Sequence, residues 1–284
     1  MNSISRENLP FVEQPNLKKL IKDEYHPEYT EYALKLNEDG YCVVDLDLDT
    51  ADINLANADI DEIVRKNEFK TNSAAYHYND SPRIVEGWKF SKSIKKIATN
   101  KKLNDILSYC YQSDPIPFST INFLKGTEQP LHSDEFHFGS IPHKYLTGVW
   151  IAFEDIHPNA GPLSIAKGSH KMPLFSFERI GLKIPKSEKE FKESYTKYEE
   201  WAKKMITSNK FEIVTPILKK GQCLIWLSNV LHGSYEIKNR ELSRKSLVVH
   251  FHFSACKKIF YPSHSNLEKN RLVPRSLKDL DIRN

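Results

Sequence analysis

The sequence predicts a mainly β fold with helical flanks. Helical patterns are concentrated before residue 111, whereas short strand-like runs dominate from residue 116 onward. Turn-forming residues separate these runs, for example at Pro158–Gly161 and Lys219–Gly221. Short, numerous strands divided by such turns are typical of an all-β sandwich or barrel rather than of βαβ units. The runs span residues 116–124, 145–154, 162–166, 211–217, 221–227 and 244–253.

The part before residue 111 is predicted to support this β core. Residues 1–15 form a loose polar arm, and Gly40 follows the first helical pattern as a natural stop. Apolar residues at helical spacing indicate further helices, and an apolar run after Gly40 indicates one strand. The helices are expected at 16–38, 56–67 and 92–111, and the strand at 41–46.

A helical insertion at about 172–210 interrupts the β-rich half. Ser187 and Glu190 have the spacing of a capping box, in which each side chain bonds the other residue's backbone. Apolar residues follow at helical spacing, so 187–207 is predicted as an amphipathic helix. It is expected to pack on the barrel, and a lid over the barrel mouth is the alternative.

These elements predict one domain over 1–284. Its parts are an N-terminal arm and helical support over 1–111, a β-barrel core over 112–255 and a C-terminal tail over 256–284.

Composition narrows the class of protein. The formal net charge is +4, and both signs are mixed along the chain without a basic stripe, so no nucleic-acid partner is expected. No apolar run approaches the roughly 18 residues of a membrane span. Residues 1–14 lack the apolar core of a secretory signal. The oligomeric state is not readable from the sequence.

The four cysteines are spread through the chain without Cys-x-x-Cys spacing, at Cys42, Cys110, Cys223 and Cys256. Each lies beside apolar or aromatic residues. Reduced, buried thiols in a cytoplasmic protein are the expected interpretation.

The first candidate for chemistry is His132-Ser133-Asp134. In an extended segment, alternate residues point to the same side, so His132 and Asp134 can offer a nitrogen and a carboxylate oxygen to one divalent metal ion. Many His-x-Asp triplets are surface turns, so this motif alone is a weak signal.

A second candidate follows the apolar run at 221–227. His232 lies just after it and could supply a third metal ligand, although a satisfied core histidine is the plainer alternative. Two histidines and one carboxylate with open positions are the ligand set of non-haem Fe(II) sites.

The run at 244–253 alternates between two faces. Leu247, Val249, Phe251 and Phe253 form an apolar face that should pack against helices. The opposite face carries Arg244, Ser246, Val248, His250 and His252. A polar face inside a barrel is explained by a bound anion, and the guanidinium of Arg244 could bind a dicarboxylate beside the metal. The alternative is a half-exposed sheet with its polar face in water.

With these motifs in order, the chain resembles the phytanoyl-CoA dioxygenase family of Fe(II)/2-oxoglutarate oxygenases. The resemblance covers roughly residues 115–254. It is carried by His132-x-Asp134, His232-x-Ser234 and Arg244, by the strand Val149–Asp155, by Asn159–Leu163 and by Lys167–Lys171. Lys167 stands where the family usually has proline, which loosens that turn.

The resemblance implies a double-stranded β-helix, a cupin-like jelly-roll barrel with the metal inside one end. It assigns His132, Asp134 and His232 to iron, and Arg244 and Ser234 to the distal carboxylate of 2-oxoglutarate. It implies that Trp150 lines the same pocket.

Further residues are predicted around this site. Thr120 and Asn122 alternate on one face of 116–124 and are expected to reach the co-substrate. Gln129 and His137 flank the ligand segment, where hydrogen bonds would orient the ligands.

The activity implied is hydroxylation. Members of this family use Fe(II), 2-oxoglutarate and O₂, release succinate and CO₂, and hydroxylate an unactivated C–H of a small molecule. Related halogenating enzymes have a small residue at the position of Asp134, where chloride binds instead, so a carboxylate there predicts hydroxylation. Candidates for substrate contact are Tyr76, Tyr78, Arg83, Trp88 and the 172–210 insertion, and ordinary surface and core packing is the plainer alternative for them.

Three alternatives remain open at this level. The same ligands could hold Zn²⁺ for hydrolysis, which leaves Arg244 and Ser234 without a clear role. The barrel could bind a ligand without chemistry. The nucleic-acid demethylases of this chemistry usually have two arginines six residues apart after the second histidine, whereas Arg240 and Arg244 are four apart.

Overall fold

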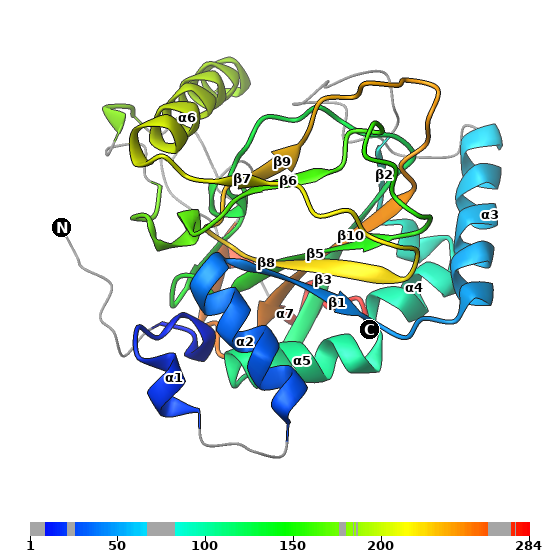
Figure 1. Ribbon diagram of the computed structural model, residues 1–284, viewed down its shortest axis with the longest axis horizontal. Coiled ribbons are helices and arrows are strands. Elements are labelled where there is room, and N and C mark those ends of the chain that lie inside the picture. The colour runs from blue at the N-terminus through cyan, green and yellow to red at the C-terminus, as the bar shows by residue number, and fades with distance from the viewer. Residues whose placement is uncertain are drawn as a thin grey trace.

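The computed structural model describes residues 9–21, 26–66, 83–175, 180–183, 185, 187–260, 274–275 and 277–284. Its largest element is a six-stranded antiparallel sheet in the order β1-β8-β5-β10-β3-β2 (Figure 1). The strands are β1 (Tyr41–Asp45), β2 (Arg83–Val85), β3 (Pro115–Phe123), β5 (Leu146–Ala152), β8 (Gln222–Leu227) and β10 (Ser246–Phe253).

A three-stranded sheet in the order β7-β6-β9 lies over one face of the large sheet (Figure 1). Its strands are β6 (Leu163–Ala166), β7 (Ile213–Val214) and β9 (His232–Ser234). The two sheets enclose an interior in the manner of a jelly roll, although strand pairing does not join them into one closed barrel among the described residues. This arrangement is the mainly β, jelly-roll class that the sequence predicts.

Helices cover the other face of the large sheet (Figure 1). They are α2 (Pro27–Asp39), α3 (Thr50–Lys66), α4 (Lys92–Ala98) and α5 (Lys101–Tyr111), with short turns α1 (Leu17–Leu20) and η3 (Gly87–Lys89). Helix α2 ends at Gly40, whose φ of +85° is the left-handed conformation that glycine adopts without strain.

Three helix boundaries differ from the predicted ones. The helix expected over 16–38 is divided into α1 and α2, because α1 ends before the extended Ile21 and α2 begins at Pro27, after the non-helical His26. The helix expected over 92–111 is broken into α4 and α5, because Asn100 caps α5 by accepting a hydrogen bond from the backbone N–H of Leu103. Helix α3 begins at Thr50, six positions before the expected start. Asp49 explains the earlier start, because its side chain accepts a hydrogen bond from the N–H of Ala51.

The core has two parts, one on each side of the large sheet. The outer part joins the helices to alternate residues of the strands, including Leu247, Val249 and Phe251 of β10. The inner part lies between the sheets and includes Trp150 and Trp226. All eight residues of β10 are buried, which excludes a half-exposed sheet at this position.

The segments at both ends pack on this core. Val12 and Glu13 lie in a buried turn, η2 (Phe11–Glu13), so the described part of the predicted loose arm is packed. Near the other end, β11 (Lys258–Phe260) pairs with β4 (Gly139–Ile141) and with β12 (Pro274–Arg275). Helix α7 (Leu277–Leu280) follows, and the backbone N–H of Ile282 donates to the carbonyl of Pro117.

The insertion forms a single long helix, α6 (Glu188–Asn209), at the upper left of Figure 1. Ser187 is its N-cap and accepts from the N–H of Glu190, as the capping-box pattern predicts. Two further short turns, η4 (Asp134–Phe136) and η5 (Ser169–Lys171), lie beside the strands of the small sheet.

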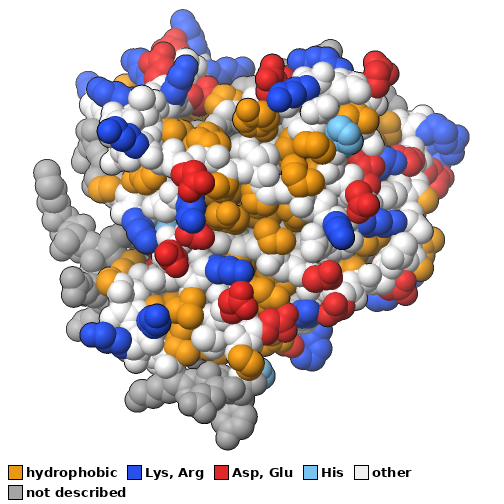
Figure 2. Space-filling model, viewed as in Figure 1, with side chains coloured by type: hydrophobic (Ala, Val, Ile, Leu, Met, Phe, Trp, Pro, Cys, Tyr) orange, Lys and Arg blue, Asp and Glu red, His pale blue; other side chains and the backbone are white. Residues whose placement is uncertain are grey.

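Surface charge is mixed on the face drawn in Figure 2, where acidic and basic side chains alternate without a field of one sign. Among the described helices, none combines the length and the apolar character needed to cross a bilayer. The four cysteines are buried and unpaired, as predicted.

Candidate metal centre and co-substrate pocket

Two histidines from distant parts of the chain meet through their backbones. His132 and His232 form an isolated antiparallel bridge, and each N–H donates to the other residue's carbonyl, at 2.8 and 2.9 Å. Directly opposed residues in such a pair point to the same side. The bridge therefore places the two imidazole centroids 4.6 Å apart inside the jelly roll.

Hydrogen bonds fix which nitrogen of each imidazole is available. Nδ1 of His132 lies 2.9 Å from the carbonyl of Pro130, and Nδ1 of His232 lies 3.1 Å from the carbonyl of Val230. A carbonyl only accepts, so each Nδ1 carries the hydrogen and each Nε2 keeps its lone pair for a metal. Burial lowers the pKa of both imidazoles, which keeps them neutral near pH 7.

Asp134 completes a set of three possible ligands. One donor atom each from His132, Asp134 and His232 lie within 4.8 Å of one another, and all three side chains are buried. Burial alone would raise the pKa of Asp134, but its interactions with His232, His250 and His132, including a hydrogen bond with His250, hold that pKa below its usual range. The carboxylate is therefore ionised, as a metal ligand must be.

The two oxygens of Asp134 have different surroundings. Oδ1 lies 3.7 Å from Nε2 of His232, on the side of the histidine pair. Oδ2 accepts a hydrogen bond of 2.8 Å from the indole N–H of Trp226 and lies 3.6 Å from Nε2 of His250. A Cβ at Gly148 would come within 2.1 Å of the Trp226 ring, so glycine is required there. Oδ1 is thus left to bind a metal through one oxygen.

Sequence reasoning did not single out Trp226 or His250 as part of the site. The signal was present for His250, because it shares the inward face of β10 with Arg244 and Ser246. Trp226 is part of the apolar run that forms β8. A tryptophan in such a run indicates a core residue and gives no sign of contact with a metal ligand.

Arg244 is a buried cation without a carboxylate partner among the described residues. Its side chain is 2% exposed and donates from Nη1 to the carbonyl of Gly161 at 3.0 Å and from Nη2 to that of Lys125 at 3.4 Å. Nη1 also lies 3.5 Å from Oγ of Ser234. Nε has no hydrogen-bond partner, and burial lowers the pKa of Arg244 to about 9. A buried, uncompensated charge of this kind favours an anion beside it.

Two aromatic rings lie beside the guanidinium of Arg244. The guanidinium carbon of Arg244 lies 5.4 Å from the ring centroid of Trp150 and 5.6 Å from that of Phe123. The indole N–H of Trp150 is also buried without a partner. Arg244, Ser234 and Trp150, which the sequence predicts to share a pocket, therefore lie together.

Thr120 and Asn122 do not belong to this pocket. Their cross-strand partners on β10 are Val249 and Leu247, which pack against the helices. Asn122 also faces Gly87, where a Cβ would come within 2.5 Å of its Oδ1. The predicted contact of these two residues with the co-substrate is therefore wrong, because they lie on the opposite face of β3 from Arg244.

Of the other residues predicted around the site, Gln129 and His137 lie close to His132, whereas Trp88 lies away from it. Nε2 of Gln129 lies 3.3 Å from Nε2 of His132, and Gln129 accepts a hydrogen bond of 3.2 Å from Arg83. The ring of His137 lies 5.9 Å from that of His132. Trp88 packs against the helical core instead. Tyr76 and Tyr78 fall outside the described residues.

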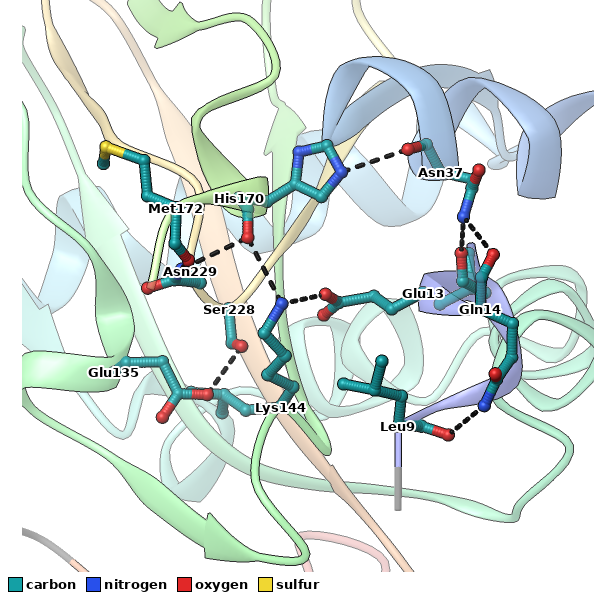
Figure 3. Close-up of polar contacts among 12 residues, drawn as sticks. Leu9, Glu13, Gln14, Asn37, Glu135, Lys144, His170, Met172, Ser228 and Asn229 are labelled. Atoms are coloured by element: carbon teal, nitrogen blue, oxygen red, sulfur yellow. Dashed lines mark hydrogen bonds and ion pairs between the residues drawn. The ribbon is translucent and has the colours of Figure 1, made fainter. Parts of the chain in front are cut away.

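Buried polar contacts lie beside residues 132–136, the ligand loop, and Figure 3 draws those of Glu135, Lys144 and Glu13. The ammonium of Lys144 contacts the carboxylate of Glu13 and donates to the carbonyl of His170 at 3.2 Å. Burial raises the pKa of Glu13, and Lys144 opposes that shift. Glu135, next to Asp134, accepts a hydrogen bond of 2.7 Å from the hydroxyl of Ser228. Burial raises the pKa of Glu135 to about 7.

Comparison with known proteins identifies the family. The family model for phytanoyl-CoA dioxygenase matches residues 36–246, which is most of the chain. The chain belongs to the phytanoyl-CoA dioxygenase family. It is accordingly a 2-oxoglutarate-dependent dioxygenase, and its cofactors are Fe(II), 2-oxoglutarate and O₂. The donors described above fit that set, because they combine two neutral imidazoles and a carboxylate with a buried cation for an acid.

Among curated proteins, human peroxisomal phytanoyl-CoA dioxygenase is 23% identical over 296 residues, covering 91% of this chain and 82% of the relative. Among solved structures, the non-haem α-ketoglutarate-dependent carbocyclase SnoK of nogalamycin biosynthesis has a TM-score of 0.65 at 15% identity, over 87% of this chain and 92% of that one. EctD from S. alaskensis with bound Fe has a TM-score of 0.58 at 17% identity, over 77% and 74%. These structures share the fold.

Proposed function

We propose that the protein hydroxylates an unactivated C–H of a small-molecule substrate and releases succinate and CO₂. In this proposal His132, Asp134 and His232 hold Fe(II), and Arg244 with Ser234 and Trp150 holds the distal carboxylate of 2-oxoglutarate. These four groups, His132, Asp134, His232 and Arg244, are the catalytic residues. The observation that carries the proposal is the uncompensated guanidinium of Arg244, buried in the same interior as the three donors.

Each protein group has a defined task. The backbone bridge and the Nδ1 hydrogen bonds orient both imidazoles, with Nε2 toward the metal position. Trp226 holds Oδ2 of Asp134, so the carboxylate supplies one oxygen and leaves positions for other ligands. Bound Fe(II), with O₂ and 2-oxoglutarate, supplies the oxidising chemistry. Burial of the site excludes water from the reacting groups.

The identity of Asp134 supports hydroxylation rather than halogenation. A carboxylate in the third position takes the place that a halide would need. Product analysis with and without chloride tests this point, and a chlorinated product would contradict it.

Succinate formation is the direct test of the activity. The purified protein, loaded with Fe(II) without oxygen, is given 2-oxoglutarate and a panel of metabolites in air, and succinate and product mass are followed. We expect succinate only with Fe(II), and more of it with a true substrate. Asp134→Ala should lose this turnover. Hydrolysis products that appear with Zn²⁺, without succinate, would favour the hydrolase alternative.

A further inference from the structure

Helix α6 packs behind the segments that carry the three candidate ligands. Its buried side chains lie on one face, at the spacing of successive helical turns. Phe191, Tyr195 and Tyr198 form a cluster with Phe136, two residues after Asp134. The helix therefore contacts the segment that carries His132 and Asp134 through Phe136.

The same helix contacts the residues that precede both histidines. Ala202 forms a second cluster with Leu231, and Leu131 and Trp201 pack against it. Leu131 is followed by His132, and Leu231 is followed by His232. Successive residues of an extended chain point to opposite sides. The helix thus packs against the side of both segments that is opposite to the side carrying the imidazoles.

One hydrogen bond joins the helix to the ligand segment directly. The hydroxyl of Tyr198 accepts from the backbone N–H of Ser133 at 2.6 Å, and Ser133 stands between His132 and Asp134. Tyr198 is fully buried, and its ring stacks on Phe136 with centroids 4.5 Å apart. Because a buried N–H needs a partner, this bond sets the backbone between the two ligands.

We propose that α6 is a fixed brace of the metal centre rather than a moving lid, and that Tyr198 is a positioning residue for His132 and Asp134. This inference rests on the proposed iron site. A rigid contact of this kind couples two equilibria: when the helix undocks, the ligand geometry is lost, and when the metal binds, the docked helix is stabilised by the same free energy.

The first test compares two buried tyrosines. Tyr198→Phe removes the hydroxyl bonded to Ser133, whereas Tyr111→Phe removes a buried hydroxyl that donates to the carbonyl of Leu146 on the helical side of the sheet. Fe(II) affinity is measured without oxygen in the presence of 2-oxoglutarate, and thermal unfolding of the metal-free proteins gives a stability control. We expect Tyr198→Phe to weaken Fe(II) binding by about 10- to 100-fold, and Tyr111→Phe to leave it close to wild type.

The second test needs no variant. Amide hydrogen exchange across residues 188–209 is followed in wild-type protein with and without Fe(II). We expect the metal alone to slow exchange in this helix. A lid would instead respond to substrate and stay unchanged by the metal.

The outcomes separate the two proposals. Tight Fe(II) binding by wild type, with equal affinity in Tyr198→Phe or unchanged exchange in α6, would overturn the brace and leave the iron site standing. A wild-type protein that does not bind Fe(II) would overturn the proposed function and the brace with it.

Discussion

The two faces of β10 are formed by alternate residues of one strand, and they differ in how their atoms are satisfied. The outer face, with Leu247, Val249 and Phe251, packs fully against the helices. The inner face has buried polar atoms without partners on His250 and His252, and Arg244, two residues before the strand, has another. Burying such atoms costs stability unless a ligand completes them. The outer face therefore stabilises the fold, and the inner face provides polar atoms for a bound ligand.

The largest effect on stability is expected on the outer face. Phe251→Ala should lower the free energy of unfolding of the metal-free protein by about 3–5 kcal/mol, because Phe251 is fully buried in the helical core. Urea unfolding measures this change. Ser246→Ala on the inner face is the matched control and should cost less than about 1 kcal/mol. Equal losses would show that the two faces do not differ in this way.

Replacing Arg244 should have the opposite pattern, with a large effect on co-substrate binding and little loss of stability. Arg244→Met should raise the KM for 2-oxoglutarate by a factor that corresponds to about 2–5 kcal/mol, since a buried charge pair is lost. Metal-free stability should stay the same or rise, because an unpaired buried cation is removed. Arg244→Lys should not restore binding, since an ammonium lacks the planar fork. An unchanged KM together with a large loss of stability would make Arg244 a structural residue.

Trp226→Phe should weaken Fe(II) binding by about 10- to 100-fold, because Asp134 loses the hydrogen bond that fixes Oδ2. The ring volume largely remains, so stability should change less than in Phe251→Ala. Metal titration without oxygen measures the affinity, with Trp88→Phe on the helical side as control. Wild-type affinity in Trp226→Phe would mean that Asp134 is held by other contacts.

The smallest effect concerns pH. Burial lowers the pKa of His252 from 6.5 to about 3, so between these values the unfolded chain takes up a proton that the folded chain does not. The free energy of unfolding should therefore fall as pH falls below 6.5, by about 1.4 kcal/mol per pH unit for this residue. In metal-free His252→Gln the dependence should be shallower by that amount. Identical slopes in urea unfolding from pH 5.5 to 4.5 would contradict this.

Much of the fold could be predicted, because the spacing of apolar residues along the sequence shows which side of a strand or helix is buried. The alternation at 244–253 gave the correct inner and outer faces of β10, and Gly40 marked the end of α2. The boundaries of α3 and α5 were missed because side-chain caps at Asp49 and Asn100 decide them, and such caps leave only a weak trace in hydrophobic patterning.

Part of the candidate site could also be predicted from the sequence, and part of it could not. His132, Asp134, His232 and Arg244 are brought into one interior, and their residue types were visible in the sequence. Thr120 and Asn122 were placed on the wrong face, because alternation defines two faces without saying which of them turns inward. The contacts of Trp226 and Tyr198 join segments far apart in the chain, and one sequence carries no record of such pairings.

Strand β1 pairs with β8, so that Tyr41 lies opposite Trp226, and β8 in turn lies against β5. Contacts between residues so distant in sequence give the fold a high contact order, which slows folding. While a ribosome is still making the chain, β1 has no partner until β8 emerges. Neither half of the molecule can complete the large sheet alone, so the sheet can close only after β8 and β10 have been synthesised.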